Sequence, residues 1–116
     1  MIMMFGDQAT MMETRSPEWI KEMIGFMDDL GRELTESGEL VAGEGLADGS
    51  TAKLVKLEDG VPVTTDGPYA ESKESLIGFW IVDVADEARV LELGGRIVKY
   101  SGVVEIRQVV AGPPEV

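Results

Sequence analysis

Residues 76–84, LIGFWIVDV, most constrain what this 116-residue chain can fold into. Strand alternation divides them into one face with Leu76, Gly78, Trp80, Val82 and Val84 and another with Ile77, Phe79, Ile81 and Asp83. Both faces are mainly apolar, whereas the helices of a two-layer domain cover only one face of its sheet. A partner subunit is the simplest cover for the second face. We therefore expect a homodimer.

Further strands and helices are predicted on both sides of this segment. Short apolar or alternating runs predict strands over residues 1–5, 39–46, 51–57, 61–65 and 103–110. Ser16-Pro17-Glu18 predicts the start of a helix, because Ser caps free N–H groups and Pro fits the first helical position. An apolar stripe at helical spacing follows, and Gly38 is expected to end this helix. Asp86 begins a second helix, which Gly94-Gly95 is expected to break or end early. Residues 8–15 have no clear period and predict a loop.

The predicted order of elements is β-α-β-β-β-β-α-β. This order indicates an α+β fold, a ferredoxin-like split βαβ arrangement with an antiparallel sheet, two helices on one face and an extra β-hairpin. Asp59-Gly60 suits the hairpin turn, and Pro62 predicts that the hairpin lies at an edge or projects from the sheet. We expect a single domain over residues 1–110 and a C-terminal tail over residues 111–116.

Composition excludes several kinds of site. The chain has neither cysteine nor histidine, which excludes thiolate nucleophiles, histidine-based triads and the usual zinc ligands. We therefore expect no metal site and no cofactor. The formal net charge of -12 disfavours direct contact with nucleic acid or an anionic membrane surface. The same acidity is also explained by solubility alone. No apolar run approaches the ~20 residues of a membrane span, so the expected location is the cytoplasm.

The corner at residues 66–69, DGPY, carries the first candidate site residues. Asp66 is the candidate general base, with Tyr69 or Lys73 as its proton partner. Alternatively, Asp66 accepts hydrogen bonds from its own turn and Tyr69 is a packing residue with a solvated tip. Gly67 and Pro68 are candidate ligand contacts that the geometry of a sharp turn also explains.

Three charged residues elsewhere complete the candidate site. Glu71 either forms a polar wall or belongs to a solvated connection. Glu44, between two glycines, lies either where a ligand approaches the backbone or at a β-bulge. Arg107 is a candidate holder of an anionic group, and its alternative role is a salt bridge with Glu105 or a subunit contact.

Several motifs together resemble the YCII-related family, in its DGPF-domain branch. They are Gly6-Asp7 after the first strand, GEGL at residues 43–46, TDGPYAESKE at residues 65–74, Gly78-Phe79, and VEIR at residues 104–107. The resemblance extends to about Val110 and implies a dimeric α/β barrel, in which two sheets pack face to face. Most members of this family have no assigned activity. One relative is a dehydrochlorinase, and some relatives are thought to use a His–Asp pair in small-molecule chemistry. Others are encoded beside alternative sigma factors. This chain has no histidine for such a pair, and Tyr69 replaces the Phe of the branch's name.

Two functional hypotheses follow. The first is a cofactor-independent lyase or isomerase acting on a small molecule in the dimer's cleft, with Asp66 as base and Arg107 as anion holder. The second is a non-catalytic ligand-binding or regulatory module that acts with a transcription partner through protein contacts. The missing histidine favours the second hypothesis.

Overall fold

The structure of the chain is a computed structural model that describes residues 1–69 and 75–113. The elements in chain order are β1 (Ile2–Gly6), α1 (Gln8–Thr14), α2 (Pro17–Ser37), β2 (Leu40–Gly45), the 3-10 helix η1 (Gly49–Thr51), β3 (Lys53–Glu58), β4 (Val61–Asp66), β5 (Ser75–Val82), α3 (Glu87–Ser101) and β6 (Val103–Ile106). None of the helices in these ranges has both the length and the apolar character needed to cross a membrane.

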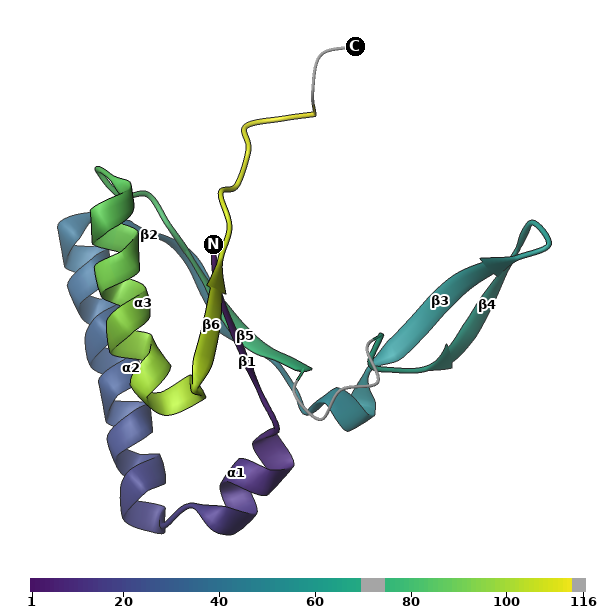
Figure 1. The fold of residues 1–116 in the computed structure, drawn as a ribbon, viewed down its shortest axis with the longest axis horizontal. Coiled ribbons are helices and arrows are strands. Elements are labelled where there is room, and N and C mark those ends of the chain that lie inside the picture. Colours follow the sequence, from purple (N-terminus) through teal and green to yellow (C-terminus); the bar gives the residue numbers. More distant parts are fainter. Residues whose placement is uncertain (70–74, 114–116) are drawn as a thin grey trace.

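The main sheet is antiparallel, with the strand order β2-β5-β1-β6. Helices α2 and α3 lie side by side against one of its faces (Figure 1). This arrangement confirms the predicted α+β, ferredoxin-like fold. The described part of one chain leaves the sheet open, without closing a barrel.

The core lies between the sheet and the two long helices. Its fully buried side chains come from β1, α2 and α3, and they are Ile2, Leu30, Leu34, Leu93 and Ile97. Each such side chain stabilises the fold by about 1.5–3 kcal/mol through removal of apolar surface from water. Met4 and Trp80 belong to the same cluster.

Helix α2 has the ends that the sequence predicts. The Ser16 side chain accepts a hydrogen bond from the Trp19 N–H, and Pro17 occupies the first turn. Gly38 ends the helix in the left-handed conformation, with φ 79°. A side chain with a Cβ is strained there, so glycine at this position is explained by the backbone.

The prediction of a loop over residues 8–15 was wrong, because residues 8–14 form helix α1. The Asp7 side chain accepts a hydrogen bond from the Thr10 N–H at 3.2 Å, and the Thr10 hydroxyl donates to the same carboxylate at 2.7 Å. Such an N-cap satisfies free N–H groups of the first turn. The sequence does contain a signal for this helix, namely the N-cap residue Asp7 followed by residues of good helix propensity.

The predicted early end of the second helix was also wrong, since α3 continues through Gly94 and Gly95 to Ser101. Gly94 is buried, and a Cβ built there would lie 3.0 Å from Ile106 Cδ1. Glycine therefore permits close contact between α3 and β6, and packing outweighs its low helix propensity. Strand β6 itself ends at Ile106, earlier than the predicted end at residue 110.

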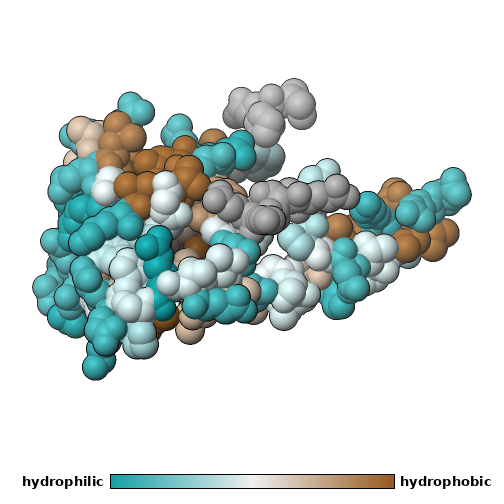
Figure 2. All heavy atoms as spheres, turned by 60° about the horizontal axis from the view of Figure 1, so that its bottom comes forward, coloured by the Kyte–Doolittle hydropathy of each residue, from teal (hydrophilic) through white to brown (hydrophobic). Residues whose placement is uncertain are grey.

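Strands β3 and β4 form a separate two-stranded sheet that projects away from the domain (Figure 1). Asp59 and Gly60, with φ 50° and 79°, make its turn, as predicted. Val55, Leu57 and Val61 leave apolar surface exposed along it. Apolar surface is visible in brown on the projecting arm at the right of Figure 2. An isolated hairpin of this kind is only marginally stable in water.

Candidate functional site: a methionine-lined pocket

A pocket of about 470 Å³ lies between α1, α2 and the sheet. Its size is within the range of small-molecule sites. The lining comes from α1, α2, β1, β2 and β5 and consists of Met4, Gln8, Met11, Met12, Met23, Met27, Asp28, Gly43, Glu44, Gly45, Ile77, Phe79 and Trp80.

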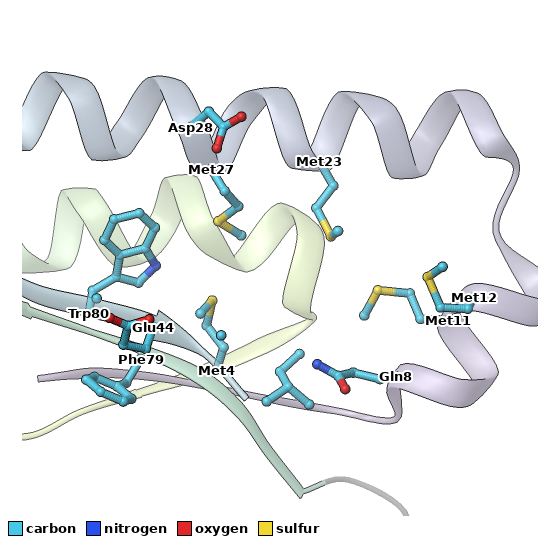
Figure 3. A pocket seen from close by; sticks show the side chains of 13 residues that line it. Met4, Gln8, Met11, Met12, Met23, Met27, Asp28, Glu44, Phe79 and Trp80 are labelled. Atoms are coloured by element: carbon cyan, nitrogen blue, oxygen red, sulfur yellow. The ribbon is translucent and has the colours of Figure 1, made fainter. Parts of the chain in front are cut away.

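Methionine side chains dominate this lining. Met23 and Met27 point from α2 toward the sheet, Met4 points from β1 toward the helix, and Met11 and Met12 approach from α1 (Figure 3). Met side chains have three rotatable bonds and a polarizable sulfur, so they adapt to ligands of different shape. The pocket wall is therefore apolar and deformable.

Trp80 forms the inner end of the pocket and is 8% exposed. Cβ atoms built at Gly31 and Gly43 would lie 3.9 Å and 3.2 Å from its six-membered ring, so glycines on α2 and β2 flank that side of the indole. Gly43 is thus a site of close approach by a side chain of the same chain, and a ligand contact at Glu44 stays a prediction. A register shift between Leu40 and Ala42 also matches the alternative of a bulge in β2.

The electrostatic character of the pocket is acidic. Asp28 and Glu44 are the ionisable residues of its lining, and no Lys or Arg of residues 1–69 and 75–113 is part of it. Asp28 projects from α2 beside Met27 in Figure 3. Gln8, the other polar lining residue, donates from Nε2 to the Leu46 carbonyl at 2.9 Å. An anionic ligand would therefore meet repulsion without a neighbouring cation among these residues.

The predicted corner at residues 66–69 lies outside this pocket. The Asp66 side chain, 83% exposed, accepts a hydrogen bond from Lys53 Nζ at 2.6 Å across the base of the hairpin. Gly67 donates its N–H to the Ala52 carbonyl at 2.8 Å, and the Gly67–Pro68 peptide is cis. Tyr69 is 86% exposed. Lys73 and Glu71 lie outside the described residues.

The remaining two predicted residues lie at different places in the fold. Glu44 is part of the lining of the methionine-lined pocket. Arg107 lines a second, more polar pocket of about 600 Å³ at the opposite end of the sheet, together with Asp83, Asp86 and Glu87. Its guanidinium lies 4.0 Å from the Glu105 carboxylate, the salt bridge named above as the alternative role. The structure therefore does not bring Glu44 and Arg107 together.

The main lining residues are not among the site residues that the sequence predicts. Met23 and Met27 belong to the predicted apolar stripe of α2, which indicates core positions, and the alternation of residues 76–84 places Trp80 only on a face of its strand. Ile77 was placed on the face opposite Trp80, but it packs against the helix-side core and lines the pocket. A register irregularity between Met4 and Phe5 of the neighbouring strand lies opposite this position. Bulges of this kind break strict alternation.

A metal centre has no support in the described residues, which contain no group of three or more Asp or Glu side chains able to hold an ion.

Comparison with known proteins gives the family. An uncharacterized protein of Rhizobium meliloti (strain 1021) is 32% identical over 82 residues, which are 66% of this chain and 66% of that protein. The chain thus spans slightly less than two thirds of that relative's length. The YCII-related domain matches residues 3–112, a range that includes the main sheet, its helices and the projecting hairpin. The chain belongs to the YCII-related family.

Proposed function

We propose that this protein binds a small, largely apolar molecule in the methionine-lined pocket. The observation that carries the proposal is the pocket of about 470 Å³, whose lining of methionines and the Trp80 indole is the kind of surface that ligands of this class use. Gln8, Asp28 and Glu44 supply the few polar groups that would fix orientation.

Binding without chemistry fits this geometry better than the lyase or isomerase hypothesis. Asp66, the candidate base, is exposed and paired with Lys53, and neither it nor Tyr69 belongs to the pocket lining. A general base must lie within hydrogen-bond reach of the proton it removes. For a ligand in this pocket we therefore expect Asp66→Asn to leave the affinity unchanged. A catalytic role for Asp66 stays a prediction.

We further propose that two copies associate through the face of the sheet away from the helices. Phe5, Phe79 and Ile81 lie on that face by their register, and each is only partly covered within one chain. Partly exposed apolar groups gathered on one sheet face are typical of a protein interface. The DGPY corner at residues 66–69 supports placing the chain in the DGPF branch, in keeping with a dimeric barrel.

Titration with N-phenyl-1-naphthylamine, an uncharged fluorescent probe, tests the binding site. We expect a saturable rise in fluorescence with the wild-type protein. Met23→Trp and Met11→Trp fill the pocket from α2 and α1, and each should weaken probe binding by about 10-fold or more, equivalent to about 1.4 kcal/mol.

Ile24→Trp is the matched control for these variants, because Ile24 is the next residue on α2, is 52% exposed and is not part of the pocket lining. It should bind the probe as the wild type does. Circular dichroism checks that each variant is folded. Equal affinity in the wild type and both folded pocket-filling variants, or no saturable binding at all, would contradict the proposal.

A further inference from the structure

The indole N–H of Trp80 is a buried donor without an acceptor in the described part of the chain. Nε1 has no hydrogen bond within residues 1–69 and 75–113, although the residue is only 8% exposed. Buried Trp N–H groups usually find an acceptor, because a buried donor left unsatisfied destabilises the protein. An acceptor on a bound ligand is one way to satisfy such a group in a pocket wall.

The orientation of the ring gives this donor a direction. The flanking glycines Gly31 and Gly43 lie against the six-membered ring. The nitrogen-bearing edge points the other way, toward the space between Met4 and Met27 inside the pocket (Figure 3). Methionine side chains can move aside at small cost. An acceptor entering from the mouth of the pocket can therefore reach Nε1 without displacement of the backbone.

The charges around the pocket restrict what that acceptor can be. Asp28 and Glu44 are the charged members of the described lining, in a chain with a formal net charge of -12. A carboxylate or phosphate on the ligand would meet this negative charge, and the described lining has no Lys or Arg to offset it or to compensate its desolvation. A carbonyl oxygen accepts the same hydrogen bond without these costs.

We propose that the pocket selects an uncharged, mainly apolar molecule with a carbonyl-type acceptor, and that Trp80 Nε1 donates to this acceptor. The methionines contact the apolar body of the ligand, and the single donor at the inner end fixes which end enters first. This inference rests on the proposed binding function, since it names the class of ligand for the same pocket.

Acetophenone and α-methylstyrene are suitable probes, because they have almost the same shape and differ in C=O against C=CH₂. Their binding can be followed in ¹⁵N–¹H correlation spectra of the full-length protein. The chain has two tryptophans, Trp19 and Trp80, so Trp80→Phe identifies the Trp80 indole signal by its loss. Acetophenone should shift that signal downfield and bind about 3- to 10-fold more tightly than α-methylstyrene, as expected for one hydrogen bond.

Trp80→Phe separates the hydrogen bond from the apolar contacts, because it keeps an aromatic ring and removes the N–H. It should lower the affinity for acetophenone to that for α-methylstyrene and leave the latter nearly unchanged. Benzoate, with the same ring and a carboxylate, should bind more weakly than acetophenone to the wild-type protein.

The outcomes distinguish this inference from the proposed function. Equal affinities for acetophenone and α-methylstyrene, with shifts of pocket signals from both, would overturn the role of Trp80 while the binding pocket stands. Benzoate binding as tightly as acetophenone would overturn the selection against charge. Absence of saturable shifts from both uncharged probes, together with no saturable binding of N-phenyl-1-naphthylamine, would overturn the ligand class and the proposed function alike.

Discussion

Gly78 allows β5 to lie close to β2 and to Met4 beside the pocket. A Cβ built at Gly78 would lie 2.7 Å from Met4 Cε and 3.0 Å from the Glu44 carbonyl oxygen. The methionine end can move, but the carbonyl belongs to the backbone of β2. Gly78 is therefore required by the spacing of the two strands rather than by an unusual φ angle.

Gly78→Ala should consequently destabilise the fold by about 1–3 kcal/mol through overpacking. Gly45→Ala is the matched control, because Gly45 pairs with Gly78 in the adjacent strand and a Cβ there meets no atom within 4 Å. It should be neutral or slightly stabilising. Urea unfolding of both variants measures the difference, and similar stability of the two would contradict this account of Gly78.

At the scale of elements, one ion pair ties the start of β2 to α3. Arg89 Nε and a terminal nitrogen of its guanidinium donate to the two oxygens of the Glu39 carboxylate at 3.0 Å and 2.8 Å. The Arg89 hydrogen bonds, with a further one from Ser37, lower the pKa of Glu39 from 4.5 to about 2. Bidentate pairs of this kind add geometric specificity as well as attraction.

This pKa shift predicts a dependence of stability on pH. Because the folded pKa of Glu39 is below its unfolded value, its contribution is fully present above about pH 4.5 and is lost as the pH falls toward 2. The stability difference between the wild type and Glu39→Gln should therefore be largest near neutral pH and shrink over this range.

Denaturant unfolding at several pH values measures that difference. Glu33→Gln is the control, since Glu33 makes a more exposed contact with Arg96 at 2.8 Å. A difference between wild type and Glu39→Gln that stayed constant from pH 7 to about pH 2 would contradict the role of the pair.

At the scale of the whole molecule, the helices cover only one face of the main sheet (Figure 1). The other face keeps Phe5, Phe79 and Ile81 partly exposed. Light scattering at micromolar concentration should give twice the chain mass of 12.6 kDa. A monomer at that concentration would contradict the homodimer.

Ile81→Glu should shift this equilibrium to the monomer, because a charge would be buried in the interface without a partner. Leu91→Glu is the control, since Leu91 is 56% exposed on α3, on the helix side of the sheet, and should leave the mass unchanged. Dissociation by both variants would indicate that added negative charge, rather than the sheet face, is responsible.

The sequence by itself determined the order of the strands and the two long helices, both caps of α2, the N-cap of α3, the Asp59-Gly60 turn and the family. These features depend on neighbouring residues, through backbone angles and local hydrogen bonds. Contacts between elements of the tertiary structure determined that α3 continues through Gly94, and they also determined on which side of the sheet Ile77 lies. The tertiary structure also determined the pocket, because Met4, Met23 and Trp80 come from distant parts of the chain. Such convergence depends on packing between elements, which the periodicity of one segment does not encode.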